Sequence, residues 1–305
     1  MEKIYDCILI GAGPAGSLCA GLLAKNNLKC LVLERLSEYG EKVCGGWVPN
    51  VALKRLESAG ICLDEIEFGI KTKSNLIIKG NEKHLYTYKD NEYGLGVQRK
   101  LFDQYLCNKA KEFGAKVHFN ERVSEISFNN GCYCINGYRS KYLVVATGAR
   151  GLLSCRQTEL YKKQSIGISE HIKGNSCLQN DTVYFWYEHP GDSEYFWAIP
   201  IGVDLWNIGL WCQKPDKQML NRYEMKRKEL LHSFKYFYTV RKRRGAFLGN
   251  VDLSSEIKVD CFGIGDFGGY NSRSTGEGLQ FAFDSAFEVF NHIKNGISLD
   301  SVFMQ

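Results

Sequence analysis

The most regular pattern of apolar and polar positions stands at the start of the chain. Residues Ile4 to Ile10 are mostly apolar with β-branched members, which is typical of a buried parallel strand. Gly11 to Gly16 follows directly, and a helical spacing of leucines then continues to about Asn26. A second apolar stretch, Lys29 to Leu33, ends on Glu34. The pattern predicts a strand, a glycine turn, a helix and a second strand followed by an acid.

This unit has the chemistry of a dinucleotide site. In a G-x-G-x-x-G turn the glycines provide a tight bend, close approach of the backbone to a pyrophosphate, and close packing of helix on strand. The helix N-terminus offers free N–H groups and a positive dipole to the phosphates, and Glu34 would accept hydrogen bonds from ribose hydroxyls. An ordinary glycine-rich turn is the alternative. The residues predicted to contact a dinucleotide are Gly11, Gly13, Pro14, Ala15, Gly16, Glu34 and Arg35.

Further along, helices alternate with blocks of strands. The pattern predicts helices at residues 50–59, 98–113, 216–238 and 276–294, and strands within residues 73–97, 115–146, 165–212 and 259–264. In the second of these helices the apolar positions on or near one face are Leu101, Tyr105, Leu106, Ala110 and Phe113. Asn-Gly pairs beginning at Asn130 and Asn136 predict hairpin turns. The strand block at 165–212 is rich in aromatic residues, which favours a sheet core.

A second glycine-rich motif runs from Gly265 to Leu279. Asp266, at the end of a predicted strand, can hold a polyol hydroxyl, and the loop then opens a helix whose N-terminus favours a developing anion. In a flavoenzyme that anion is the reduced flavin. A glycine-rich turn followed by a helix therefore occurs near both ends of the chain. Two such sites suit a cofactor with a dinucleotide part and a flavin part, so we predict FAD rather than NAD. Its flavin end is predicted to contact Asp266, Gly276, Gly278 and Leu279.

The chain resembles the FAD-dependent superfamily of aromatic hydroxylases, flavin halogenases and geranylgeranyl reductases, and it is most similar to the geranylgeranyl reductase branch. Four segments carry the resemblance: Gly11 to Gly16 with Glu34, Val43-Cys44-Gly45-Gly46, Tyr195 to Pro200, and Gly265-Asp266 with Thr275 to Gly278. Together they span residues 4 to about 290. The resemblance implies that Cys44, Gly45, Arg99, Ala146 and Gly148 also lie at the FAD.

Arg99 stands at an unfavourable position for a cation. Arg99 begins a helix, where a cation opposes the dipole. A phosphate or flavin oxygen nearby would explain it, and a solvated arginine is the alternative.

Cys44 could lie over the flavin ring, where it would tune the ring, donate a proton or bond to it covalently; a small residue chosen for fit is the alternative. Trp197 and Tyr195 are the other catalytic candidates, because alternate strand positions can form an apolar pocket at the flavin.

The predicted fold class is α/β, with a Rossmann-like FAD-binding domain on a parallel sheet, interleaved with a mostly antiparallel β-sheet substrate domain. Nucleotide-binding segments occur at the start, middle and end of the chain, so no single linker separates the domains. We assign residues 1–66, 97–160 and 245–296 to the FAD-binding domain, 67–96 and 161–244 to the substrate domain, and 297–305 to a tail.

Three positions depart from the superfamily pattern. Arg150 stands where the superfamily has an aspartate, which puts a phosphate or pyridine-nucleotide contact there in doubt. Arg273 replaces a usual proline and would be able to hold an anionic group. Halogenases carry two tryptophans before the Ile-Pro pair, and here only Trp197 stands, which disfavours halogenation.

Composition narrows the choice of function class. The 305 residues carry a formal net charge of +5, which is mild for a nucleic-acid binder. The 12 cysteines are scattered without metal-ligand spacing, and the histidines also lack it, so no metal site is predicted. No apolar run is long enough to span a bilayer and no export signal is recognised, so we expect a cytoplasmic protein. A basic cluster, 226–228 with 241–244, indicates a solvated surface or contact with an anionic membrane surface or a diphosphate.

These observations predict a soluble FAD-dependent oxidoreductase that reduces a C=C bond of a small apolar, isoprenoid-like substrate by hydride transfer from flavin N5. The alternatives are a flavin monooxygenase or halogenase-like enzyme that uses a flavin hydroperoxide, and a flavin redox sensor without a substrate. NADPH or NADH is the candidate reductant, although the sequence does not identify the electron donor. No nucleic-acid partner is expected.

Overall fold

The first sheet carries the start of the chain. The computed structural model describes residues 4–150, 165–188, 193–248, 261–272 and 275–295. The sheet has the order β8-β2-β1-β11-β10-β9, with β17 also paired to β11. Its strands are β1 (Ile4–Ile10), β2 (Cys30–Leu33), β8 (Lys116–His118), β9 (Ile126–Asn129), β10 (Cys132–Ile135), β11 (Tyr138–Val145) and β17 (Phe262–Gly263). Strands β8, β2, β1, β11 and β17 run parallel, whereas β9 and β10 form an antiparallel extension. The buried, apolar β1 and β2 match the prediction for a parallel sheet covered on both faces.

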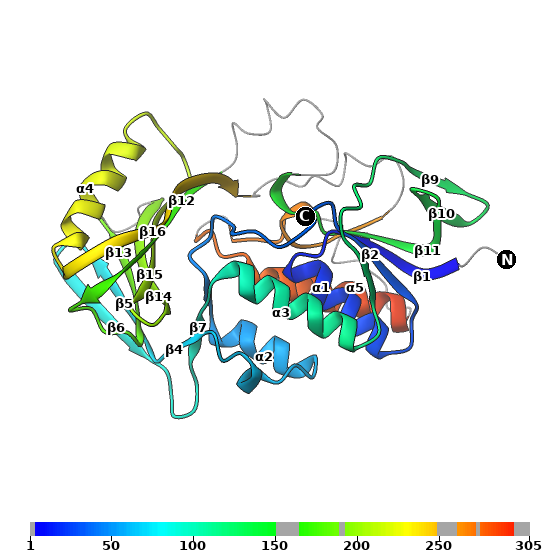
Figure 1. The fold of residues 1–305 in the computed structure, drawn as a ribbon, viewed down its shortest axis with the longest axis horizontal. Coiled ribbons are helices and arrows are strands. Elements are labelled where there is room, and N and C mark those ends of the chain that lie inside the picture. Colours follow the sequence, from blue (N-terminus) through cyan, green and yellow to red (C-terminus); the bar gives the residue numbers. More distant parts are fainter. Residues whose placement is uncertain (1–3, 151–164, 189–192, 249–260, 273–274, 296–305) are drawn as a thin grey trace.

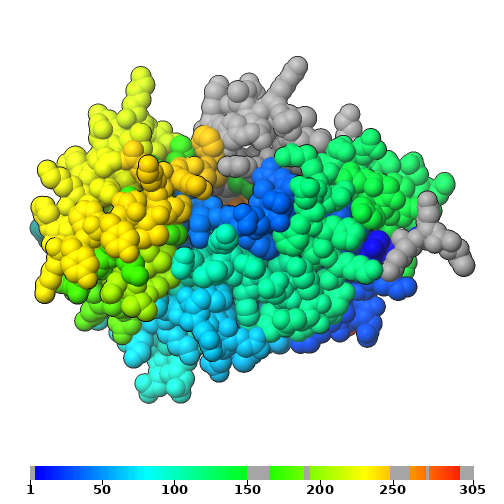
Figure 2. Space-filling model, viewed as in Figure 1, coloured from blue at the N-terminus to red at the C-terminus, as the bar shows by residue number. Residues whose placement is uncertain are grey.

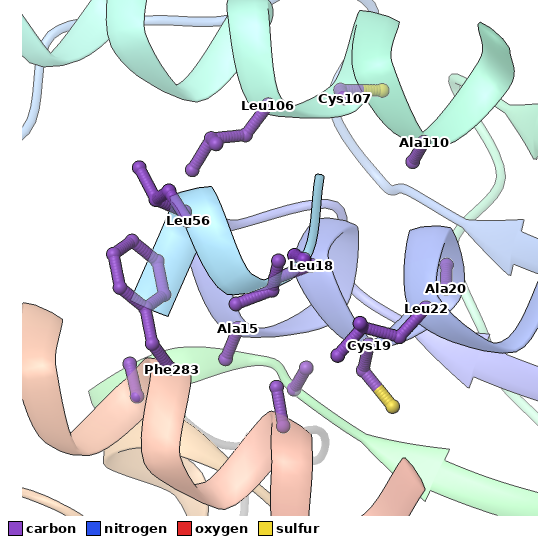
Figure 3. Packing of buried hydrophobic residues seen from close by; sticks show 14 of the residues in the cluster. Ala15, Leu18, Cys19, Ala20, Leu22, Leu56, Leu106, Cys107, Ala110 and Phe283 are labelled. Atoms are coloured by element: carbon purple, nitrogen blue, oxygen red, sulfur yellow. The ribbon is translucent and has the colours of Figure 1, made fainter. Parts of the chain in front are cut away.

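Helices cover this sheet and meet at the first helix. They are α1 (Pro14–Lys25), α2 (Asn50–Ser58), α3 (Arg99–Glu112) and α5 (Leu279–Asn295). Helix α1 lies between α3 and α5, and Figure 3 shows Leu18 of α1 near Leu106 of α3 and Phe283 of α5. Almost the whole surface of α1 is buried, so its position relative to β1 is tightly fixed.

The predicted buried face of α3 is only partly right. Leu106 and Ala110 are buried as expected, but Leu101 is 37% exposed. The buried face instead includes the charged pair Arg99 and Asp103. Phe102 and Cys107 are buried too, so the true face lies about one residue beyond the predicted one, and its two buried charges give no apolar signal.

The second sheet is large and mostly antiparallel, with the order β16-β12-β15-β14-β13-β5-β6. Its strands are β5 (Ser74–Lys79), β6 (Glu82–Thr87), β12 (Ser165–Ser176), β13 (Thr182–Tyr187), β14 (Glu194–Gly202), β15 (Leu205–Cys212) and β16 (Phe234–Leu248). Only the β13–β5 pair among these is parallel. The predicted helix at 216–238 is too long: α4 spans Met219–Leu231, and the chain from Phe234 onward is a strand, which pairs with β12 along its length.

A three-stranded sheet joins the two larger ones. It has the order β3-β7-β4, formed by β3 (Trp47–Val48), β7 (Gly94–Gly96) and β4 (Ile70–Thr72). Figure 1 shows the second sheet with α4 on one side of the molecule and the first sheet with its helices on the other. In Figure 2, blue residues from the first part of the chain lie in the middle, between the yellow and green residues of the two sides.

The predicted fold class is confirmed: a helix-covered parallel sheet is combined with a mostly antiparallel one. The Asn-Gly turns are also confirmed, since Asn130, Gly131, Asn136 and Gly137 all have positive φ. The domain boundaries remain a prediction, and β16 continues to Leu248, past the proposed boundary at 244. The tail at 297–305 and Arg273 lie outside the described residues. Among the described helices, none has the length and apolar character to cross a membrane.

Candidate functional site

A cavity of about 1130 Å³ lies where the sheets meet. This is larger than the roughly 300–1,000 Å³ of a typical ligand pocket, so it has room for an extended cofactor together with a substrate. The predicted site residues that line it are Gly11, Gly13, Pro14, Ala15, Glu34, Arg35, Cys44, Gly45, Arg99, Ala146, Gly148, Tyr195, Trp197, Asp266, Gly276, Gly278 and Leu279. Gly16 does not line the cavity; it packs against the backbone of Gly11. The structure thus brings together residues that are more than 250 positions apart in the chain.

The first glycine turn is held open at the N-terminus of α1. Gly11 has φ +104°, and a Cβ on it would lie 2.5 Å from the carbonyl oxygen of Ala146. Gly13 precedes the helix and supplies no side-chain cap, so the first N–H groups of α1 face the cavity without a protein partner in the helix. Glu34 accepts hydrogen bonds from Ala12 N (2.8 Å) and Leu36 N (3.0 Å). This fixes the carboxylate beside the turn, where the sequence predicts a ribose contact.

The C-terminal glycine motif lies directly against the first turn. A Cβ on Gly265 would be 3.2 Å from Cβ of Ala15. The position of a Cβ on Gly278 is 3.5 Å from Asp266 Oδ1. Burial raises the pKa of Asp266, while Lys42 and Arg99 act in the opposite direction. Helix α5 begins at Leu279 rather than at residue 276 as predicted, so Gly276 and Gly278 belong to the loop that leads into it.

A buried ionic cluster supports the cavity floor. Asp103, fully buried, accepts from Arg99 Nε at 2.9 Å and Nη2 at 3.3 Å, and lies 2.7 Å from Lys42 Nζ. Although burial alone would raise the pKa of Asp103, Arg99 and Lys42 hold it below its usual value. Arg99 is only 9% exposed, so the alternative of a solvated arginine is wrong. Lys42 Nζ is also 3.4 Å from the position of a Cβ on Gly13. Lys42 therefore lies within reach of an anion bound at the first turn, and Arg99 adds a second cation to the cavity wall.

The aromatic wall belongs to the second sheet. The Tyr195 hydroxyl donates to the carbonyl of Thr275 at 2.6 Å, and burial raises its pKa well above the usual range. The Trp197 indole N–H donates to Asn207 Oδ1 at 3.0 Å. Gly209 leaves room for this ring, because a Cβ there would lie 2.2 Å from Cζ2 of Trp197. With their polar atoms committed to the protein, Tyr195 and Trp197 offer mainly ring surface to a ligand.

Cys44 lies at the meeting point of these elements. Its thiol is half-buried and accepts from the Gly46 N–H at 3.4 Å. The neighbouring Arg99 interacts with the same sulfur. The backbone carbonyl of Cys44 accepts from Asn207 Nδ2 at 2.6 Å. The geometry gives Cys44 access to the cavity, and its chemical role remains a prediction.

The residues present are suited to FAD. Beyond the glycine turns, polar atoms without a protein partner are buried in the cavity wall: Thr147 Oγ1, both amide atoms of Asn271, and Trp211 Nε1. Buried polar groups are normally hydrogen-bonded, so these atoms are consistent with a polar ligand in the cavity. Among the described residues no group of three or more potential metal ligands is found.

Four residues were missed or left without a role by the sequence interpretation: Lys42, Asp103, Asn207 and Trp211. The spacing of Arg99 and Asp103, four apart in a helix, was a usable signal. Lys42, Asn207 and Trp211 reach the site only through long-range packing, so local patterns contain no sign of them.

Comparison with known proteins agrees with this geometry. The family model described as FAD binding domain matches residues 5–158. The chain is 24% identical over 299 residues to a digeranylgeranylglycerophospholipid reductase of Methanococcus vannielii, covering 93% of this chain and 75% of the relative. It is 28% identical over 332 residues to a protein of the same name from Methanocella arvoryzae, covering 99% and 80%.

Solved structures extend the similarity to the whole fold. A geranylgeranyl bacteriochlorophyll reductase-like protein of Thermoplasma acidophilum superposes with a TM-score of 0.79 at 21% identity, over 97% of this chain and 79% of the other. A flavin-dependent brominase gives a TM-score of 0.76 at 20% identity, over 99% and 82%. At these identities the structural likeness concerns the fold alone. The family match and the curated relatives go further: the chain belongs to the FAD binding domain family and is an FAD-dependent oxidoreductase similar to the geranylgeranyl reductases.

Proposed function

We propose that the protein reduces a C=C bond of an isoprenoid chain, with a prenylated lipid as the substrate class. The observation that carries this proposal is the position of the aromatic wall: Tyr195, Trp197 and Trp211 line the same cavity as the two glycine motifs. Ring surface suits a polyisoprenoid, which offers many CH groups and few polar ones. The names of the curated relatives support the same substrate class.

The residues of the cavity have separate roles in binding the cofactor and orienting the substrate. The first turn, with Lys42 and Arg99, would bind the phosphates of FAD, and Asp266 would hold its polyol chain. When bound and reduced, FAD supplies a hydride to one carbon of the double bond, and a proton must reach the other. The wall formed by Tyr195 and Trp197 orients the alkene and excludes water.

Two side chains of the cavity can deliver that proton. Cys44 is one, as the sequence suggests. Glu277 is the other, because it lines the cavity and burial raises the pKa of its carboxyl group, so it keeps a proton to higher pH than a free glutamate. Bound water is the third source.

The direct test is a single turnover without oxygen. The FAD-loaded protein is reduced with a low-potential donor and mixed with a geranylgeranyl lipid or with its fully saturated counterpart. We expect the flavin to be reoxidised only by the unsaturated lipid, with a product heavier by two hydrogens. Reoxidation only by oxygen, with an oxygenated or halogenated product, would establish the monooxygenase or halogenase-like alternative. Reoxidation by neither would favour a redox sensor. Reduction with NADPH or NADH in place of the donor tests these two reductants.

Replacing Cys44 by alanine tests its role in that turnover. We expect the rate of flavin reoxidation to fall by about 100-fold if the thiol delivers the proton, the lower limit for loss of a positioned general acid. The matched control is Cys62→Ala, which removes an exposed thiol. An unchanged rate in the Cys44 variant would leave this residue a role in packing alone. Mass spectrometry of the denatured wild-type protein shows whether the flavin is covalently linked.

In the structure some cations of this basic region are buried or paired, and others remain exposed. Arg241 is buried and donates to Ser169, and Arg227 pairs with Glu170. Lys235 and Lys242 remain exposed on β16, the strand that also carries the exposed rings of Tyr236 and Tyr238. Cations beside exposed aromatic rings are typical of surfaces that lie at a membrane interface. We propose that β16 makes peripheral contact with anionic lipid, which would present the lipid substrate to the enzyme.

Vesicle sedimentation tests this contact. Changing Lys235 and Lys242 together to glutamine is expected to weaken binding to phosphatidylglycerol vesicles by roughly 30-fold, since each lysine near an anionic surface contributes about 1 kcal/mol. The control makes the same charge change at Lys83 and Lys89, exposed residues at the other end of the sheet. Equal loss in both variants would indicate a general charge effect and contradict a docking role for β16.

A further inference from the structure

Asn207 joins the aromatic wall to the Cys44 loop through a single side chain. It lies on β15, is 2% exposed, and is the register partner of Ile199 on β14 and of His171 on β12. Its Oδ1 accepts from Trp197 Nε1 at 3.0 Å. Its Nδ2 donates to the backbone carbonyl of Cys44 at 2.6 Å and lies 3.2 Å from His171 Nε2.

The chemistry of the partners fixes how this amide is oriented. An indole N–H can only donate and a backbone carbonyl can only accept, so the oxygen must face Trp197 and the nitrogen must face Cys44. The second N–H of the amide points to His171, which therefore accepts through Nε2 and carries its proton on Nδ1. Burial, together with Arg241, lowers the pKa of His171 to about 3, so the imidazole stays neutral and able to accept at physiological pH.

The Cys44 loop is also anchored on the dinucleotide side of the cavity. Lys42 is held by Asp103 on α3, and the carbonyl of Gly46 accepts from Val97 N at 2.7 Å. The bond from Asn207 ties the loop to the second sheet, where Gly45 and Gly46 also pack closely against Ile199 and Ile201 of β14. It acts at the residue whose thiol faces the cavity, and it also holds the ring of Trp197.

We propose that Asn207 is a positioning residue: its amide sets the placement of the Cys44 loop relative to Trp197, and so holds the thiol and the aromatic wall in register across the cavity. The hydrogen-bond geometry carries this inference. Its consequence for turnover rests on the reductase function proposed above.

The test uses the FAD-loaded protein and measures how fast iodoacetamide alkylates Cys44, quantified by mass spectrometry of its peptide. The variants are Asn207→Ala, which removes both halves of the amide, and Asn207→Asp, which keeps an acceptor for Trp197 but cannot donate to Cys44. We expect both to raise the Cys44 alkylation rate by about tenfold, because each removes a buried hydrogen bond whose contribution to holding the loop corresponds to a change of that size. Cys62 and Cys177, which are exposed, serve as references within the same sample.

Two controls separate positioning from general loosening. Asn175→Ala changes an exposed asparagine on β12 and is expected to leave all three alkylation rates unchanged. If the alanine variant does not fold, Asn207→Ser keeps a small polar group at the position and takes its place. Equal acceleration at Cys44, Cys62 and Cys177 would show loosening of the whole chain and overturn the proposal. An unchanged Cys44 rate in the aspartate variant would overturn it too.

Turnover gives the second readout. In the single-turnover assay we expect the Asn207 variants to lower the limiting rate of flavin reoxidation by about tenfold, with less than about a twofold change in the lipid concentration for half-maximal rate. Altered thiol protection without reductase activity in the wild type would refute the proposed function alone. Normal thiol protection in an active enzyme would refute the role of Asn207 alone.

Discussion

Replacing Gly16 by alanine is expected to abolish stable retention of FAD. A Cβ at this position would lie 2.1 Å from the carbonyl oxygen of Gly11 and 3.1 Å from Cβ of Ala146. Neither neighbour can yield cheaply, because Gly11 is fixed in a left-handed conformation and Ala146, directly after β11, is held by its N–H bond to the carbonyl of Ile10. Forcing extra atoms into such a contact costs about 3 kcal/mol. That is about 150-fold in binding if the cost falls on the cofactor-bound form.

The measurement is the flavin content per chain after gel filtration, together with the midpoint of thermal unfolding. Gly21→Ala in the same helix is the matched control. Its Cβ would come no closer than 3.3 Å, to the side chain of Phe113, and alanine favours the helix by about 1 kcal/mol, so this variant should keep its flavin. A Gly16 variant that binds FAD like the wild type would show that close packing of α1 on the sheet is not what forms the site.

Gly16 also illustrates which parts of the site can be read from sequence. The glycine motifs depend on backbone geometry within a few residues, so the strand, turn and helix follow from local pattern alone. The sequence assigned Gly16 to helix–strand packing, and its contact with Gly11 is in keeping with that role. In the C-terminal motif the same local reasoning placed the helix start three residues early, because the loop there is shaped by its bond from Tyr195, which is 80 positions away.

The parts of the site that the sequence did not yield all depend on distant partners. Asn207 and Cys44 are 163 positions apart and meet only because β15 faces the loop after β2. The inward turn of Arg241 depends on the pairing of β16 with β12, whereas a run of four cations reads as solvated surface. Periodicity also misplaces the buried face of α3, where two of the residues buried near the N-terminus, Arg99 and Asp103, are charged. Buried polar contacts are satisfied in three dimensions, and neither composition nor spacing records their partners.

Among these buried polar contacts, the ion pair of Asp103 with Arg99 should have the largest effect on stability. Replacing Asp103 by asparagine leaves Arg99 buried without a counter-charge, and loss of one partner of a buried ion pair costs about 3–5 kcal/mol. We expect the free energy of unfolding in urea to fall by that amount at neutral pH. We also expect weaker retention of FAD, since Lys42 and Arg99 line the cavity. Glu112→Gln is the control in the same helix: its side chain is 58% exposed, and its pair with Lys109 should contribute less than about 0.5 kcal/mol.

The pH dependence shows whether the carboxylate charge is the cause. Because Arg99 and Lys42 hold the pKa of Asp103 below its value in the unfolded chain, its contribution is complete above about pH 4 and is lost as the pH falls through the folded-state value. The stabilities of wild type and Asp103→Asn should therefore converge on acidification; a gap that stays constant would point to packing instead. If the unpaired cation is the source of the loss, Asp103→Leu combined with Arg99→Met will be more stable than Asp103→Leu alone. Lys42, 45% exposed, can turn to solvent, whereas Arg99 cannot, so the second substitution has to be made at Arg99.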